Sequence, residues 1–309
     1  MPQQQINPAA VYFQSALVPR NYPELIDSIE RYTTFLRAYT GHTATSKIDE
    51  ETITTAFGLR KEHLPLLPSQ RGLTIEPIGL IGINGEDIAT RQRFTFGHEL
   101  MELYFSYLVR LSPSPTIARY CDGRDKENLC ERGSGMLLMP PAVIKPMVDA
   151  GGVSIAMASR LTYQFGSSLT AAFIAMISVA DEPHAVVSWK LAWKESEKSF
   201  VRDELIPLFD DYEFRPPKKI RVQWSMISEA TSRITIFREK SAEENSPVLL
   251  AHSSGTATTG ADRLHTTAGV LTVSVEARPF QTATDSHVIA LYSLPESVRA
   301  VTLEPLLLT

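Results

Sequence analysis

The side chains best suited to carry out chemistry lie in one short stretch, His98-Glu99-Leu100-Met101-Glu102. Residues 98 and 102 are four apart, so on a helix both side chains share a face and can reach a single metal ion. The zinc-binding pattern HExxH places imidazoles at these two positions, and its intervening glutamate deprotonates a water molecule. Here Glu102 takes the place of the second imidazole, and a carboxylate is also a zinc ligand. The pattern therefore predicts a metal held by His98 and Glu102, with Glu99 as general base.

The surrounding segment bears on whether this stretch is a metal site or an ordinary solvated helix face. Residues 89–111 carry apolar side chains at helical spacing, and a Ser-Pro-Ser-Pro run at 112–115 ends the predicted helix. A helix this apolar packs into a core, where ionisable groups need partners. A cation is the simplest partner for one histidine and two glutamates. From the sequence alone, the solvated face remains the alternative.

A third ligand is expected from the next predicted helix, residues 125–139. Glu127 and Glu131 lie one turn apart on it. We expect Glu127 to coordinate the metal and Glu131 to hydrogen-bond a ligand and orient it. Cys130 lies on the same helix and is expected to belong to the core.

Two blocks of the sequence resemble the ImmA/IrrE family of zinc metallopeptidases. Residues 93–100, Arg-Phe-Thr-Phe-Gly-His-Glu-Leu, are similar to the family's metal-binding helix, and Glu127 leads into its Leu-Leu-Met-Pro ending at 137–140. The chain departs from the family at Glu102, where a histidine is usual, and at Glu131, where Asn or Asp is usual. By position, the resemblance implies that His98, Glu102 and Glu127 are metal ligands and that Glu99 is the base.

The resemblance also implies an organisation and an activity. It implies an α+β protein with a mostly helical, zincin-like peptidase domain (1–150), a helix-turn-helix-like segment (151–183) and a strand-rich, GAF-like sensor domain (184–309). The implied reaction is metal-dependent, site-specific cleavage of a helix-turn-helix transcriptional repressor in response to DNA damage or phage. Zinc is the implied metal, and the carboxylate-rich site leaves manganese open. The alternative is a catalytically inactive sensor or adaptor that keeps the peptidase fold to bind a repressor or nucleic acid.

The hydrophobic pattern supports this division independently. Helical spacing dominates up to about residue 180, whereas the runs after residue 184 alternate with period two. This order predicts two α+β units joined near residue 183. A Ser/Thr/Gly-rich stretch at 253–262 is expected to be a loop. The second unit contains no catalytic constellation, so we expect it to bind an effector, either a small molecule or a single-stranded nucleic acid.

Several further side chains have two interpretations. Cys121 precedes Glu127 by six residues, so its thiolate is a candidate inhibitory metal ligand or an ordinary semi-buried thiol. Tyr120 is a candidate donor to an oxyanion. Three cationic residues near the tryptophans are candidate contacts to nucleic acid, or else a basic turn before a strand: Lys218, Lys219 and Arg221.

Composition excludes several other classes of protein. The chain has 309 residues, 43% hydrophobic and 21% charged, which excludes disordered and collagen-like proteins. Two cysteines cannot form a disulfide framework. The formal charge of −5 gives no general attraction to nucleic acid. Neither a signal peptide nor a membrane-spanning run is apparent, so a cytoplasmic protein is expected.

Overall fold

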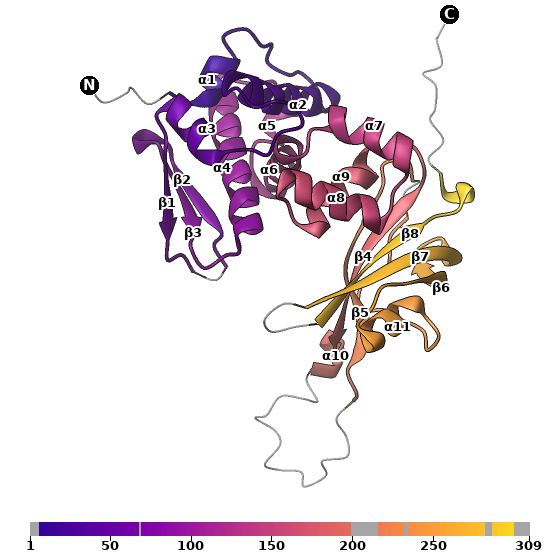
Figure 1. Cartoon of the computed structure of the whole chain (residues 1–309). Helices are drawn as coiled ribbons and strands as arrows, with labels where there is room; N and C mark the ends of the chain where they lie inside the picture. The colour runs from indigo at the N-terminus through magenta and orange to yellow at the C-terminus, as the bar shows by residue number, and fades with distance from the viewer. Residues whose placement is uncertain (1–5, 68, 199–215, 232–233, 282–285, 300–309) are drawn as a thin grey trace, which may run out of the picture. The chain divides into compact units, whose positions relative to one another are not determined.

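The computed structural model describes residues 6–67, 69–198, 216–231, 234–281 and 286–299. It has the predicted α+β fold and divides into two compact units (Figure 1). The first unit comprises residues 1–150 and 158–175, and the second comprises 151–157 and 176–309. The sequence analysis instead divides the chain into three parts with other boundaries, and that division stays a prediction. No helix among the described residues is both long and apolar enough to cross a membrane.

The first unit consists of helices around a small sheet. The sheet has the order β1-β3-β2, with β1 parallel and β2 antiparallel to the buried central strand β3. Its strands are β1 (Arg60–Leu64), β2 (Gly72–Ile75) and β3 (Leu80–Asn84), with the short η1 (Glu76–Ile78) between the last two. The helices are α1 (Pro8–Tyr12), α2 (Tyr22–Tyr39), α3 (Glu50–Phe57), α4 (Ala89–Arg110), α5 (Pro115–Ala118), α6 (Gly123–Leu138), α7 (Pro141–Gly151), α8 (Ile155–Phe165) and α9 (Leu169–Val179); α7, α8 and α9 extend across the unit boundaries.

Helix α4 is the central element of this unit, because it contacts β2 and β3 as well as α6. Its close approach to α6 depends on small residues. A Cβ atom added at Gly97 would lie 2.5 Å from the Ser134 Oγ and 3.3 Å from the Ser134 Cα, and one added at Gly133 would lie 2.4 Å from the Met101 Sδ. The Ser134 hydroxyl also donates a 2.7 Å hydrogen bond to the Phe94 carbonyl. These contacts fix the spacing of the two helices that carry the predicted metal ligands.

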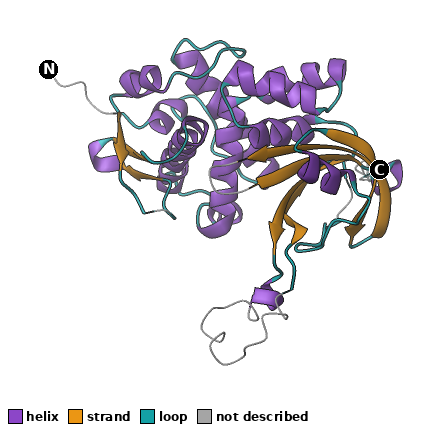
Figure 2. Ribbon diagram, turned by 60° about the horizontal axis from the view of Figure 1, so that its bottom comes forward, coloured by secondary structure: helices purple, strands orange, loops and turns teal. Residues whose placement is uncertain are grey.

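The second unit is built on an antiparallel sheet of order β5-β4-β8-β7-β6, whose curved strands are seen in Figure 2. The strands are β4 (His184–Ala192), β5 (Lys219–Ile227), β6 (Thr258–Thr266), β7 (Gly269–Gln281) and β8 (Ser286–Ser293). Helix α11 (Pro247–Ser254) packs on β6, β7 and β8; α10 (Glu195–Lys198) and η4 (Glu296–Val298) are short. The loop predicted at 253–262 was wrong in part, because its last residues form β6, which pairs along its whole length with β7.

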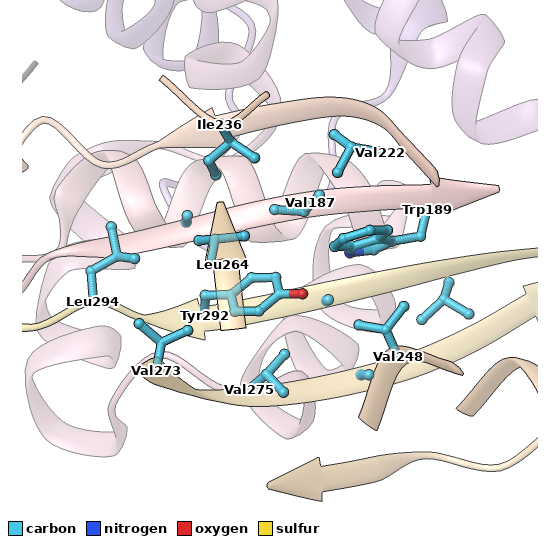
Figure 3. Packing of buried hydrophobic residues seen from close by; sticks show 14 of the residues in the cluster. Val187, Trp189, Val222, Ile236, Val248, Leu264, Val273, Val275, Tyr292 and Leu294 are labelled. Carbon is cyan, nitrogen blue, oxygen red and sulfur yellow. The ribbon is translucent and has the colours of Figure 1, made fainter. Parts of the chain in front are cut away.

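Residues 234–242 connect the two edge strands of this sheet. Phe237 N donates to the His265 carbonyl of β6 (3.3 Å), and Ala242 N donates to the Ile220 carbonyl of β5 (2.8 Å). The core that the sheet encloses includes Trp189, Tyr292 and Ile236 (Figure 3). Backbone groups at both edges are therefore partly paired, which protects the sheet from edge-to-edge association.

Gly97 of α4 and Gly135 of α6 give a matched pair of substitutions, because only Gly97 lies in the contact between the helices. Gly97→Ala should destabilise the protein by about 1–3 kcal/mol, because the added methyl group overpacks the contact with α6. Gly135→Ala should instead stabilise it by about 0.5–1 kcal/mol, because nothing lies within 4 Å of the added Cβ atom and alanine favours the helix. Urea denaturation of both variants measures the difference. Equal effects at the two positions would contradict the packing described for α4 and α6.

Candidate metal centre and its surroundings

Helix α4 presents its ionisable residues in two directions. His98 and Glu102 face α6, where the His98 Nε2 lies 3.9 Å from a Glu102 carboxylate oxygen and 3.4 Å from one of Glu127. Glu99, one residue on, turns about 100° around the helix and faces β2. The structure thus brings together His98, Glu102 and Glu127, as the sequence indicated, and adds Cys130. The Cys130 thiol donates to the Glu102 Oε1 at 3.6 Å.

The spacing of these atoms suits a tetrahedral metal ion. Ligand atoms of His98, Glu102 and Cys130 all lie within 4.8 Å of one another. Metal–ligand distances of 2.0–2.3 Å place neighbouring donors of a tetrahedral zinc site about 3.3–3.8 Å apart. Within this group, a Glu102 oxygen lies 3.9 Å from the His98 Nε2 and 3.6 Å from the Cys130 sulfur, close to that range, and the third separation is within 4.8 Å. The donor types are ones that zinc accepts, and the atoms would have to draw closer together to share one ion.

The two oxygens of the Glu102 carboxylate have different partners, because Lys126 pairs with only one of them. Its ammonium group lies 2.9 Å from Oε2 of Glu102, while Oε1 faces His98 and Cys130. Burial lowers the pKa of Lys126, but the hydrogen bond and negative charge of Glu102 outweigh it and the net pKa is raised. A firmly protonated lysine both orients the carboxylate and offsets one of the negative charges gathered between the helices.

Glu99 is buried against the edge strand β2. Its Oε2 accepts a 2.7 Å hydrogen bond from the Thr74 hydroxyl, and a Cβ atom at Gly72 would lie only 2.6 Å from its Oε1. The net pKa of Glu99 is raised to about 7. Burial is the largest cause and the charges of Glu102 and Glu127 add to it, whereas the hydrogen bond from Thr74 and the charge of Lys126 lower the pKa. A carboxyl group with a pKa near neutrality can both accept and return a proton, as a general base must.

Three other predicted site residues lie outside the candidate metal group found among the described residues: Glu131, Tyr120 and Cys121. Glu131 is exposed and, in the part of the chain that is described, forms no hydrogen bond or ion pair, so it does not orient a ligand. Tyr120 packs on Tyr22 and its hydroxyl accepts a hydrogen bond from Arg119. The Cys121 thiol donates to the Ile117 carbonyl at 3.5 Å, and burial raises its pKa. Burial raises the pKa of the Cys130 thiol as well, so the pKa does not distinguish the two cysteines. Their positions do, because the candidate metal group found among the described residues contains Cys130 and not Cys121, which supports the ordinary interpretation of Cys121.

Cys130 is the site residue that sequence reasoning missed. The expectation that it belongs to the core is met, because it is fully buried, yet its sulfur also lies among the candidate metal donors. A signal for it was present in the sequence. Cys130 follows Glu127 by three residues, and side chains at that spacing share a helix face.

The three basic residues predicted to contact nucleic acid do not all lie on the surface. Arg221 is buried and forms a two-oxygen ion pair with Glu197 at 3.0 Å, so the prediction that it contacts nucleic acid needs correction. Lys218 and Lys219 are exposed, and the Lys218 ammonium lies 4.4 Å from the centre of the Trp193 ring. Trp189 is buried in the core and cannot stack on a base.

A polar pocket of about 660 Å³ lies elsewhere in this unit. It combines three exposed cationic residues with acidic and hydroxyl groups. At its floor, the buried Asp262 accepts hydrogen bonds of 3.0 Å from Ser246 and Tyr292. The charged residues that line the pocket are Lys219, Lys240, Arg263, His265, Glu243, Glu244 and Asp262.

Comparison with known proteins identifies a similar fold. No protein-family model and no curated protein matches the sequence. Among solved structures, the chain is similar to one described as a Mycobacterium tuberculosis transcriptional regulator, with a TM-score of 0.51 and 11% sequence identity. The match covers 89% of this chain and 77% of the other. At this identity the likeness shows a shared fold alone.

The environment of Glu99 predicts a pH-dependent stability. Because its pKa is raised from 4.5 to about 7 in the metal-free protein, the stability present below the ordinary pKa should be lost as the pH rises through the folded value. Relative to Glu99→Gln, the metal-free wild type should lose up to about 3 kcal/mol of unfolding free energy between about pH 4.5 and pH 8. Urea denaturation in the presence of a chelator measures this. A difference between the two proteins that does not change with pH would show that Glu99 is not desolvated.

Proposed function

We propose that the chain is a metal-dependent, site-specific endopeptidase that cleaves a helix-turn-helix transcriptional repressor in response to a stress signal. The observation that carries the proposal is the position of Glu99, a buried carboxyl group with a pKa near 7, next to the donors His98 and Glu102 on one helix. His98, Glu102 and the α6 donors would hold zinc, which supplies Lewis acidity toward a peptide carbonyl. Glu99 would take the proton of the attacking water and later return it to the leaving amine.

The sheet of the first unit supports a polypeptide substrate. β2 is one of the two edge strands of that sheet, and its Gly72 lies against the Glu99 carboxyl group. An extended peptide can add to an exposed sheet edge through main-chain hydrogen bonds, which would place its backbone beside the base. The repressor as substrate follows from the family resemblance, and the regulator fold of the structural neighbour is compatible with such a role.

We further propose that the second unit controls the reaction by binding an effector, either a small molecule or a single-stranded nucleic acid. The polar pocket around Asp262 is the supported site for a small, charged molecule. Lys218 and Lys219 remain available for phosphate groups, because both are exposed. Coupling requires that the effector bind the active and inactive states with different affinities.

A non-catalytic adaptor is the second candidate, and a specific observation favours it. Every donor in the centre already has a protein partner: His98 pairs with Glu127, and Glu102 pairs with Lys126 and Cys130. Such a network satisfies buried charges without a metal ion. In this role the fold would bind a repressor without cleaving it.

Substitution of the base distinguishes the two candidates. Glu99→Gln should abolish cleavage of a co-encoded repressor while leaving the fold and one equivalent of bound zinc unchanged, because glutamine is nearly isosteric but cannot accept the proton. Cleavage is followed by gel electrophoresis, and zinc by elemental analysis. If the folded variant still cleaves, Glu99 is not the base. If the wild type neither binds zinc nor cleaves, the adaptor is the better account.

Lys126 should influence the zinc affinity of a Glu102→His variant. Imidazole suits zinc better than carboxylate does, but Glu102→His alone leaves the Lys126 ammonium unpaired beside the metal. Zinc affinity should therefore improve only when Glu102→His is combined with Lys126→Gln, as measured by competition with a chromophoric chelator. Lys145→Gln, at an exposed ion pair with Asp149, is the matched control. Equal affinity of the single and double variants would exclude an influence of Lys126.

A further inference from the structure

The Cys130 sulfur lies in a position that the proposed metal centre can use. It is buried, 3.6 Å from the Glu102 Oε1, and within 4.8 Å of the ligand atoms of His98 and Glu102. Glu127, the carboxylate expected as third ligand, has a side chain that is 55% exposed. Of the two α6 donors, the cysteine is thus the one held rigidly by the surrounding core.

We propose that Cys130 is a metal ligand and that the centre is formed by one imidazole, one carboxylate and one thiolate. This inference rests on the proposed metal centre and names a donor of that same site. On metal binding, the thiol proton is released to solvent and the sulfur coordinates as thiolate, with no change of oxidation state. The hydrogen bond that the thiol gives to Glu102 already directs the sulfur toward the site.

The positions of Lys126 and Glu127 are consistent with this donor set. Lys126 holds the far oxygen of Glu102 at 2.9 Å, which leaves the near oxygen for the metal. Glu127 then becomes an exchangeable fourth donor. Glu127 would be able either to complete a set of four protein ligands or to leave one position for water, as catalytic zinc sites do.

A thiolate donor also determines which metal fits. Soft sulfur ligands select zinc and its spectroscopic substitute cobalt, whereas manganese prefers carboxylate, carbonyl and water oxygens. The centre should therefore bind zinc in strong preference to manganese, although its carboxylates alone leave either metal open.

Titration of the full-length, reduced protein with Co²⁺ alone tests the inference. The wild type should bind one equivalent and develop a thiolate-to-cobalt charge-transfer band in the near ultraviolet. Cys130→Ser should lose the band and bind cobalt at least about 10–100-fold more weakly, since even the loss of an outer partner of a metal ligand costs that much. Cys121→Ser, the matched control at the other cysteine, should keep both the band and the affinity.

The wild-type spectrum is decisive even if Cys130→Ser does not fold. Cobalt bound without the charge-transfer band, a band that survives Cys130→Ser, or no cobalt binding at all would overturn the inference. Repressor cleavage is assayed separately on the zinc-loaded wild type. If the protein shows the band but does not cleave, Cys130 remains a ligand and the proposed peptidase activity is wrong. If it cleaves without the band, the peptidase activity stands and Cys130 is not a ligand.

Discussion

The close contact between α4 and α6 is the constraint on which the rest of the first unit depends. Gly97 and Gly133 allow the helix axes to approach, and the Ser134 hydroxyl ties one helix to the other. Only at this spacing do side chains from two separate helices bring donor atoms within 4 Å of each other. Another side of α4 contacts β2, so the same helix also places Glu99 beside an edge strand.

Charge balance is the second requirement of this arrangement. Glu99, Glu102 and Glu127 lie near one another, and their mutual repulsion contributes to the raised pKa of Glu99. Lys126 offsets one negative charge directly. A divalent ion would offset two more; in its absence the His98 Nε2 lies 3.4 Å from a Glu127 carboxylate oxygen. These side chains are therefore candidate metal donors that are also paired with one another.

The sequence predicted those parts of the molecule that depend on local pattern. The apolar spacing of residues 89–111 gave the long helix, and the four-residue spacing of His98 and Glu102 gave two site residues on one face. Contacts between distant segments were harder to predict. The partner of Arg221 is Glu197, twenty-four residues away, so a buried ion pair resembled a basic surface. β6 has few apolar residues and forms because β7 pairs with it. The role of Lys126 depends on the relative rotation of two helices, which periodicity does not determine.

The central claim is that α4 and α6 together form a metal centre, and an anomalous difference map collected at the zinc absorption edge tests it most directly. Crystals of the full chain grown with zinc should show one peak between the helices, about 2.0–2.3 Å from the His98 Nε2 and the Glu102 Oε1. Lys126 should remain on the other oxygen of Glu102. A map without a peak between α4 and α6, with His98 still paired to Glu127, would contradict the claim.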